Sequence, residues 1–248
     1  MSTIILITGA NSGVGLASTA VIASASAEYH VIMASRNPEN GKKALAETQA
    51  LDGIKGTLST VQLDVTDQAS IKNAVKVVEE QFGHLDVLVN NAGVVSQAPD
   101  LKTQFEDTFA TNVLGPALVT QAFTPLLLKS KNPYSIYVSS GLGSLTMAAD
   151  ASRWDYNVEA PVYRATKAAL NMWAVQESKM LEKQGVKTFA MCPGFVVSNL
   201  RGKDESARSG GGMAKDPRIS GEVMLSIIDG RQDANVRKFV STEGVYPW

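Results

Sequence analysis

Short apolar segments alternate with amphipathic segments from one end of the sequence to the other. The apolar segments cover residues 4–8, 31–34, 60–64, 87–90, 135–139, 187–191 and 238–241. The first of them is apolar on both faces, which is typical of a strand buried in a parallel sheet. Strands that alternate with helices in this way require right-handed crossovers. The sequence therefore predicts an α/β fold, a doubly wound Rossmann-type domain whose parallel seven-stranded sheet is covered by helices on both faces.

Helices are expected in the segments between the strands. Residues 68–82 carry apolar side chains at helical spacing after Asp67, whose carboxylate is the expected N-cap. A long helix over 103–130 is expected to bend near Pro116 or Pro125, because proline removes a backbone donor. The remaining helices are predicted over 13–26, about 40–51, from Tyr163 to about 184, and about 217–229.

The composition is uniform along the chain, without a repeat or a linker. The 248 residues are 44% hydrophobic and 19% charged, with a net charge of -1, so we expect one domain over 1–248 with a sizeable core. This charge balance favours neither a nucleic-acid partner nor a membrane-surface partner. The polar, glycine-rich stretch 202–215 is expected to be a mobile substrate loop, or else a surface excursion without a role.

Cysteine and histidine are scarce. Cys192 is the only cysteine, which excludes an intrachain disulfide and suits a reducing compartment. His30 and His84 are the only histidines, so we expect neither a histidine-based metal site nor a Ser-His-Asp triad. The apolar start of the sequence is too short for a signal peptide, and no stretch reaches the roughly 18 apolar residues of a membrane span. We therefore expect a cytoplasmic protein without a metal.

A glycine-rich loop joins the first predicted strand to the first predicted helix, and its glycines follow the spacing Gly-x-x-x-Gly-x-Gly. The residues concerned are Gly9, Asn11, Ser12, Gly13, Val14 and Gly15. At the carboxyl end of a parallel strand such a loop can approach a phosphate, and the following helix offers free N–H groups and a partial positive charge. A glycine trio alone also fits a simple tight turn. Its position between a strand and a helix favours a dinucleotide pyrophosphate site.

Tyr163 and Lys167 have the spacing Tyr-x-x-x-Lys in a segment of helical character. Positions four apart lie on the same face of a helix. A nearby ammonium favours the phenolate and so lowers the pKa of a tyrosine from about 10. A tyrosine adjusted in this way can exchange a proton with a carbonyl or alcohol oxygen. Taken alone, the pair could equally lie over a surface without a chemical role.

These two motifs and several others, in order along nearly the whole chain, resemble the short-chain dehydrogenase/reductase family. The resemblance implies that three further segments hold a nicotinamide cofactor. They are Asp64 and Val65 beside the adenine ring, Asn91, Ala92 and Gly93 of an Asn-Asn-Ala-Gly segment on the adenosine side, and Pro193, Gly194, Val196 and Ser198 at the nicotinamide carboxamide. Ser198 stands where threonine is commoner in the family, which keeps the hydroxyl.

The same resemblance implies a catalytic set made of Asn112, Ser140, Tyr163 and Lys167. Tyr163 would donate a proton to the carbonyl oxygen, and Ser140 would hydrogen-bond that oxygen. Lys167 would lower the pKa of the tyrosine and hold the hydroxyls of the nicotinamide ribose. The main chain of Asn112 would hold a relay water.

The stretch between Ser140 and Tyr163 is longer than is usual in the family. If this insertion is aligned differently, Ser139 or Ser144 would replace Ser140. The role of the insertion, residues 141–162, is open: its aromatic side chains could form a wall of the substrate pocket or only pack the insertion against the domain.

The segments around Ser140 and Tyr163 also resemble, more weakly, the sniffer-type and fungal polyketide-tailoring carbonyl reductases. This second resemblance implies a carbonyl substrate on a bulky or aromatic scaffold. The side chains expected around such a ligand are Val95, Trp154, Tyr156 and Phe195.

Arg36 follows the second predicted strand, where no Asp or Glu is present. A free 2′-hydroxyl on the cofactor ribose needs a carboxylate at this place, whereas a 2′-phosphate needs a guanidinium. Lys42 and Lys43 are close in sequence. Although a solvated surface arginine would look the same, the pattern favours NADP over NAD.

The combined prediction is an NADPH-dependent carbonyl reductase that transfers a hydride to a ketone or aldehyde. An NAD(P)-dependent secondary alcohol dehydrogenase is the alternative within the enzymes. The alternative of another class is an NADP-sensing regulatory protein without turnover. The family resemblance further implies a homodimer or homotetramer.

Overall fold

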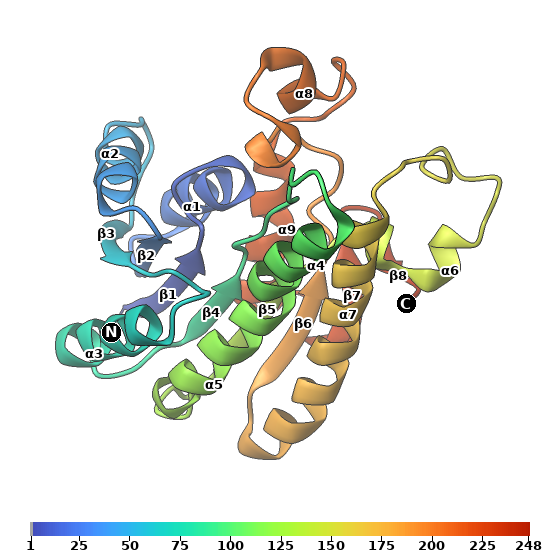
Figure 1. The fold of residues 1–248 in the computed structure, drawn as a ribbon. Helices are drawn as coiled ribbons and strands as arrows, with labels where there is room; N and C mark the ends of the chain where they lie inside the picture. Colours follow the sequence, from blue (N-terminus) through green and yellow to red (C-terminus); the bar gives the residue numbers. More distant parts are fainter. Residues whose placement is uncertain (1) are drawn as a thin grey trace.

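The sheet forms the centre of the computed structural model, which describes residues 2–248 (Figure 1). Its eight strands have the order β3-β2-β1-β4-β5-β6-β7-β8. Their bounds are β1 Thr3–Thr8, β2 Tyr29–Ser35, β3 Thr57–Gln62, β4 Val87–Asn90, β5 Tyr134–Val138, β6 Lys187–Met191, β7 Phe239–Ser241 and β8 Gly244–Tyr246. The first seven pair in parallel, as expected, whereas β8 runs antiparallel to β7. The α/β class is confirmed, and the strand count is eight rather than seven.

The additional strand is a three-residue hairpin partner at the edge of the sheet. Ser241 pairs with Gly244, whose φ of 111° lies in a region that favours glycine. The ring of Phe239 in β7 lies 5.7 Å from that of Tyr246 and 5.6 Å from that of Trp248. Aromatic packing therefore holds a strand that is too short to produce a periodic sequence pattern.

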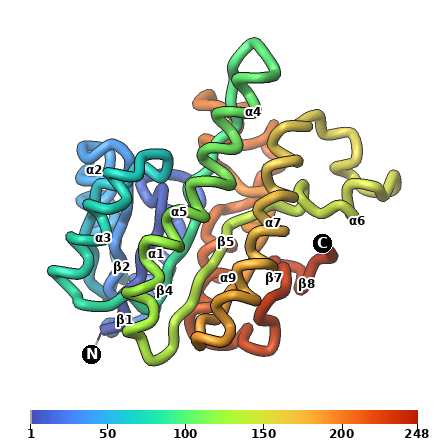
Figure 2. Tube along the Cα trace, turned by 60° about the horizontal axis from the view of Figure 1, so that its bottom comes forward, coloured from blue at the N-terminus to red at the C-terminus, as the bar shows by residue number. Residues whose placement is uncertain are grey.

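Helices cover both faces of the sheet (Figure 1). Their bounds are α1 Gly13–Ala25, α2 Pro38–Gln49, α3 Gln68–Phe82, α4 Leu101–Phe109, α5 Gly115–Leu127, α6 Leu145–Ala148, α7 Pro161–Leu181, α8 Glu205–Ser209 and α9 Arg218–Ile228. On one face α1 packs against α9, and on the other α3 packs against α5. In both views α4, α5 and α7 lie alongside one another (Figures 1 and 2).

The alternation of side chains in β1 explains this layered arrangement. Ile5 and Ile7 belong to the core beneath α1 and α9, whereas Ile4 and Leu6 belong to the core beneath α3 and α5. All four are at most 4% exposed. Each such side chain stabilises the fold by about 1.5–3 kcal/mol when it is removed from water. The strand is thus buried on both faces, as its uniformly apolar sequence predicted.

The long helix expected over 103–130 is interrupted. A π-helical turn, Ala110–Leu114, separates α4 from α5, and the amide of Gly115 donates to the carbonyl of Ala110. In a regular α-helix the carbonyl of Asn112 would accept from residue 116, which is a proline without an N–H. The helix therefore widens by one residue at this point, near Pro116, where the sequence predicts an irregularity.

The segment 202–215 contains a short helix as well as loops. It holds α8, which ends at Ser209 with Gly210 as its C-cap, and Gly210 to Gly212 all have positive φ values. Val196 forms a bridge with Lys215 at the base of the segment. In Figure 1, α8 stands beyond the ends of the strands. Its mobility remains a prediction.

Two features are absent from the part of the chain that the structure describes. Within residues 2–248, no helix combines the length and the apolar character that a membrane crossing requires. The same residues contain no group of three or more histidine, cysteine or acidic side chains placed to hold a metal ion.

A buried carboxyl group connects α7 to the sheet. Glu177 is 5% exposed and accepts a hydrogen bond from the hydroxyl of Tyr137 in β5. That hydroxyl also lies 2.9 Å from the hydroxyl of Thr120 in α5. Burial raises the pKa of Glu177 from 4.5 to about 7. The folded state therefore binds one proton more than the unfolded state between these pH values, and its stability falls as the pH rises through that window.

We predict that Glu177→Gln stabilises the protein in a pH-dependent manner. The amide keeps an acceptor for Tyr137 but cannot ionise, so the free energy of unfolding should increase by about 1–3 kcal/mol at pH 8 and change little at pH 5. Thermal unfolding at the two pH values measures the difference. Glu182→Gln, at an exposed carboxylate paired with Arg237, is the control. An equal effect at both pH values would contradict the role of burial.

Candidate active site

A cavity of about 530 Å³ lies at the carboxyl ends of the central strands. The sheet order changes direction between β1 and β4, and ligands of open parallel sheets bind at such a switch point. The residues that line the cavity include most of those predicted to bind a cofactor. They are Gly9, Asn11, Ser12, Gly13, Val14, Arg36, Asp64, Val65, Asn91, Ala92, Gly93, Pro193 and Ser198.

Close backbone packing between β1 and β4 shapes the floor of this cavity. Asn91 donates from its side-chain amide to the carbonyls of Thr8 at 2.7 Å and Gly9 at 3.3 Å. A Cβ on Gly15 would lie 2.5 Å from the Asn91 amide nitrogen, and one on Gly9 would lie 3.1 Å from the Cα of Ala92. Gly9 also has a φ of 64°. Glycine is therefore required here for packing and not only for a turn.

The N-terminus of α1 opens toward the same cavity. Ser12 is its N-cap, but the Ser12 side chain makes no capping hydrogen bond. The first amides of α1 thus remain available to an anion, and the helix dipole adds a partial positive charge. Because Asn11, Ser12, Gly13 and Val14 all line the cavity, this end fits a pyrophosphate.

Polar and basic groups lie at the end of β2. Arg36 is exposed and lines the cavity together with Asn37 and Asn40. The side chain of Asn37 caps α2 by accepting from the amides of Glu39 and Asn40. Within residues 2–248 the guanidinium of Arg36 has no carboxylate within ion-pair distance. An anionic ligand group could therefore bind here.

Tyr163 and Lys167 lie next to each other on α7 and both line the cavity. They are 9% and 4% exposed, and the ammonium of Lys167 lies 5.7 Å from the centre of the Tyr163 ring. The same ammonium donates to the carbonyl of Val138 at 2.8 Å. Pro161 stands in the first turn of α7, where its missing N–H costs nothing. The four-residue spacing thus places both groups on one buried helix face.

Burial dominates the protonation of this pair. It raises the pKa of the Tyr163 phenol above its usual value, while the hydroxyl of Ser140 and the charge of Arg201 act in the opposite direction. It lowers the pKa of Lys167 from 10.5 to about 8. The expectation that Lys167 lowers the pKa of the tyrosine below 10 is therefore wrong for the protein without ligand, because desolvation of the phenol outweighs the opposing effects.

Asn112 lies behind the cavity wall, and Ser140 is half-buried beside the Tyr163 phenol, outside the residues that line the cavity. The side chain of Asn112 is fully buried, accepts from the amide of Val94 at 2.8 Å and donates to the hydroxyl of Thr166 at 3.1 Å. This links the π-helical turn to α7. The Ser140 hydroxyl accepts from the amide of Leu142 at 3.2 Å and lies close enough to the Tyr163 phenol to lower its pKa.

The hydroxyls of the two alternative serines, Ser139 and Ser144, form hydrogen bonds with groups other than the Tyr163 phenol. Ser139 lines the cavity, but its buried hydroxyl donates to the carbonyl of Lys167 at 3.4 Å. The Ser144 hydroxyl is fully buried and accepts from the amide of Met147, which caps α6. Of the three hydroxyls, that of Ser140 is the one that acts on the Tyr163 phenol.

Three residues predicted to bind the cofactor do not line the cavity. Gly15 packs against Asn91, Gly194 faces Thr242 and Ile219, and Val196 is 3% exposed behind the wall. Each supports the wall of the cavity rather than forming its surface.

Of the side chains expected around the substrate, only Val95 lines the cavity. Trp154 and Tyr156 are 68% and 46% exposed. The ring of Trp154 lies 5.7 Å from that of Phe195, so an aromatic pair connects the insertion to the segment after β6. Tyr156 takes no part in this pair.

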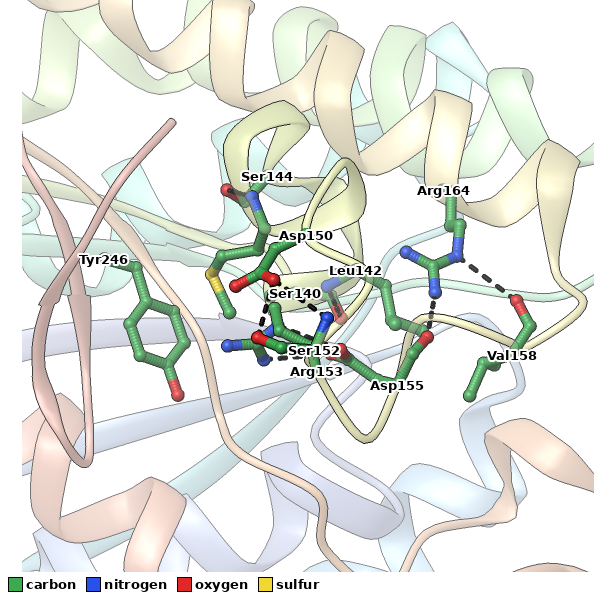
Figure 3. A network of polar contacts seen from close by, with 12 residues as sticks. Ser140, Leu142, Ser144, Asp150, Ser152, Arg153, Asp155, Val158, Arg164 and Tyr246 are labelled. Atoms are coloured by element: carbon green, nitrogen blue, oxygen red, sulfur yellow. Dashed lines mark hydrogen bonds and ion pairs between the residues drawn. The ribbon is translucent and has the colours of Figure 1, made fainter.

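Polar contacts hold the insertion in place (Figure 3). Arg153 donates to both carboxylate oxygens of Asp155, at 2.9 and 3.1 Å. Arg164 of α7 donates to the main-chain carbonyls of Asp155 and Val158. Asp155 is 5% exposed. The ion pair thus stiffens the segment that carries Trp154 from within, and Arg164 anchors that segment to α7.

Several residues of the cavity were not predicted from the sequence. They are Ser35, Asn37, Asn40, Leu63, Thr66, Val94, Thr111, Val138, Asn199, Leu200 and Lys203. Asn37 could have been recognised from its position before Pro38, which is typical of an N-cap followed by proline at the first helical position. The others reach the cavity because neighbouring loops converge at the carboxyl ends of the strands.

Comparison with known proteins identifies the class. A family model described as short chain dehydrogenase matches residues 3–209. The short-chain dehydrogenase/reductase tropE of Talaromyces stipitatus is 33% identical over 254 residues, covering 97% of this chain and 95% of tropE. The short-chain dehydrogenase/reductase eupG of Phoma sp. is 33% identical over 271 residues, covering 98% and 96%. The chain therefore belongs to the short-chain dehydrogenase/reductase family.

A solved structure of similar fold supports this assignment. The carbonyl reductase from chicken fatty liver, solved with bound NADPH, superposes with a TM-score of 0.82. It is 30% identical, and the match covers 100% of this chain and 99% of that protein. The protein is thus an oxidoreductase of a family that uses NAD(P).

We predict that Lys167→Met abolishes activity without lowering the stability of the fold at pH 7. Because the pKa of Lys167 is lowered in the folded state, wild-type stability rises as the pH increases from about 8 to 10.5, and the buried ammonium is unfavourable at pH 7. Methionine removes that cost but also the bond to Val138. At pH 7 the variant should therefore be as stable as the wild type, or more stable by up to about 3 kcal/mol, while losing oxidoreductase activity.

Thermal unfolding at pH 7 and pH 10 tests this expectation, and the advantage of the variant should shrink at the higher pH. Lys179→Met, at an exposed position of the same helix, is the matched control and should show neither effect. A variant that is markedly less stable at pH 7 would show that the ammonium stabilises the fold.

Proposed function

We propose that the protein is an NADPH-dependent carbonyl reductase that converts a ketone or aldehyde to an alcohol. The observation that carries this proposal is the pair of Tyr163 and Lys167, buried side by side on the wall of a cavity that also contains the uncapped N-terminus of α1. A proton donor and a dinucleotide site thereby adjoin the same space.

The chain's own residues have distinct parts in the proposed reaction. NADPH, when bound, supplies the hydride to the carbonyl carbon. Tyr163 gives its phenolic proton to the carbonyl oxygen, and its raised pKa keeps that proton in place at neutral pH. Ser140 stabilises the oxygen as negative charge develops. Lys167 favours the phenolate once the proton has left.

Asn112 completes the path by which Tyr163 recovers its proton. Its side chain ties Val94 to Thr166, and its main-chain carbonyl lacks a regular helical donor because residue 116 is proline. That carbonyl is therefore suited to accept from a water near Lys167. The π-helical turn is, in this view, part of the catalytic arrangement.

Arg36 supports a preference for NADP. Its exposed guanidinium lines the cavity at the end of β2, close to Asn37 and Asn40, and no Asp or Glu stands at the strand end itself. A fork of N–H donors fits a 2′-phosphate, whereas a 2′-hydroxyl would need an acceptor. The chicken carbonyl reductase of similar fold binds NADPH.

We expect Arg36→Ala to change cofactor choice. The dissociation constant for NADPH should rise about 10- to 100-fold, because a charge-assisted bond to a phosphate is lost, while that for NADH should change little. Fluorescence titration of each reduced cofactor measures both constants. Lys43→Gln, which removes an exposed partner of Glu47 on α2, is the control. Equal losses for both cofactors would contradict the assignment.

We expect Tyr163→Phe to abolish turnover while keeping the cofactor bound. The ring and its packing remain, but the proton donor is lost, so kcat should fall about 100- to 10,000-fold. The dissociation constant for NADPH should stay within about threefold of the wild-type value. NADPH oxidation with a panel of aryl and cyclic ketones measures turnover. A regulatory protein that only senses NADP would behave the same before and after the change.

The substrate scaffold is proposed to be bulky or aromatic. Trp154 and Phe195 form an aromatic pair, and Arg164 of α7 anchors the insertion that carries Trp154. Exposed aromatic side chains of this kind offer stacking surface to a ring.

The protein is proposed to act in the cytoplasm as a single-domain homodimer or homotetramer. One continuous sheet runs through residues 3–246, which supports a single domain. Leu114, Met172 and Met180 are 56%, 60% and 65% exposed on the adjoining helical segments around α5 and α7, which supports an interface between copies. The single thiol, Cys192, is buried and free and suits a reducing compartment.

A further inference from the structure

Arg201 lies in the segment that connects the cofactor cavity to the aromatic pair. It ends a single 3₁₀ turn, Asn199–Arg201, directly after Ser198. Its guanidinium lies 4.6 Å from the centre of the Phe195 ring, and that ring lies 5.7 Å from the ring of Trp154. The result is a continuous wall of a cation and two aromatic rings beside the proposed substrate position.

Three main-chain carbonyls hold the guanidinium in a fixed orientation. Nε donates to Ala207 at 3.0 Å, and Nη2 donates to Val196 at 2.8 Å and to Arg208 at 2.7 Å. A guanidinium has five N–H donors, so these bonds leave the two on Nη1. Nη1 makes no hydrogen bond with any residue that the structure describes. The group is therefore preorganised with two donors still available.

The charge of Arg201 is not balanced by the protein. The ion pairs among residues 2–248 do not include it, and its three acceptors are neutral carbonyls. Arg201 is half-buried, and burial lowers its pKa; the Tyr163 phenol is the one titratable group that opposes this effect. The proximity is mutual, since the charge of Arg201 lowers the pKa of Tyr163. A partly desolvated cation without a carboxylate is unfavourable until an anion binds.

We propose that Arg201 binds an anionic oxygen of the substrate, so that the carbonyl compound reduced at Tyr163 is an aromatic or bulky acid that carries a carboxylate or an ionised hydroxyl. This inference rests on the proposed carbonyl reduction and makes Arg201 the residue that determines specificity. The two free N–H groups of Nη1 match the two oxygens of a carboxylate. The rings of Phe195 and Trp154 contact the scaffold of the same molecule.

The cofactor is a less suitable anion for Arg201. The cavity that fits the dinucleotide is lined by Leu200 and Lys203 but not by Arg201. The cations of that cavity outside α7 are Arg36 and Lys203. Arg201 instead lies against Phe195 of the aromatic pair, and its charge acts on the Tyr163 phenol, from which the carbonyl oxygen must receive its proton.

Matched acids and esters test the inference. The substrates are 2-, 3- and 4-acetylbenzoate and their methyl esters, which differ in charge but share the aryl ketone. In the wild-type enzyme with NADPH, kcat/KM for at least one acid should exceed that of its ester about 10- to 100-fold, the effect of a charge-assisted hydrogen bond. Arg201→Gln should remove this preference, mainly through KM. Equal or better use of every ester would overturn the proposal.

Two further variants separate charge from loop structure. Arg201→Lys keeps the charge but cannot reproduce the three carbonyl bonds, so it should retain part of the preference for acids even if overall activity falls. Arg208→Gln removes the neighbouring arginine, which pairs with Glu205 at 3.5 Å, and should leave the preference unchanged. An acid preference that persists in Arg201→Gln, or disappears equally in Arg208→Gln, would contradict the role of Arg201.

A binding measurement distinguishes failure of this inference from failure of the proposed function. Tryptophan quenching of the enzyme with bound NADP⁺, which has no hydride to transfer, gives dissociation constants for the acetylbenzoates and their esters without turnover. Turnover without an acid preference would refute the role of Arg201 and keep the reductase. Acid-selective binding that requires Arg201, without reduction of any carbonyl, would refute the reductase and keep the anion site. Weak, unselective binding would overturn the inference.

Discussion

The buried ammonium of Lys167 is the constraint on which the arrangement of the site depends. It is 4% exposed, and its hydrogen-bond acceptor is the carbonyl of Val138 at the end of β5. A charge in this position is unfavourable, as its lowered pKa of about 8 indicates. The bond that offsets this cost also fixes α7 over β5. Tyr163, one helical turn earlier on the same face, is thereby held at the cavity.

Two asparagines connect further segments to this part of the site. Asn112 joins the π-helical turn to α7 through Thr166, and Asn91 joins β1 to β4 at the floor of the cavity. Both amides satisfy buried backbone or hydroxyl groups, which would otherwise be costly. A parallel sheet brings these segments together because all its strands end at the same edge. The same few hydrogen bonds therefore hold the fold together and position the catalytic and cofactor-binding residues.

The sequence predicted those features that depend on residues close together in the chain, and missed those that depend on contacts between distant segments. The α/β class, the glycine loop and the Tyr163–Lys167 face follow from short patterns. Of the two prolines near which a bend was expected, Pro116 follows the π-helical turn, whereas Pro125 lies inside α5. The strand β8 could not be predicted, because three residues form it only against β7. Burial of Tyr163 reversed the expected direction of its pKa shift. The environment of Arg201 depends on carbonyls of residues 196, 207 and 208, whose convergence no sequence pattern reveals.

The most direct test of the central claim is isotope transfer from NADPH deuterated at C4 of the nicotinamide. With an aryl ketone that the enzyme turns over, mass spectrometry of the alcohol should find one deuterium on the carbinol carbon from one of the two C4 epimers, and none from the other. Solvent deuterium should appear only at the exchangeable hydroxyl. Oxidation of NADPH without deuterium in the product, or no oxidation by any carbonyl compound, would contradict a hydride-transferring reductase.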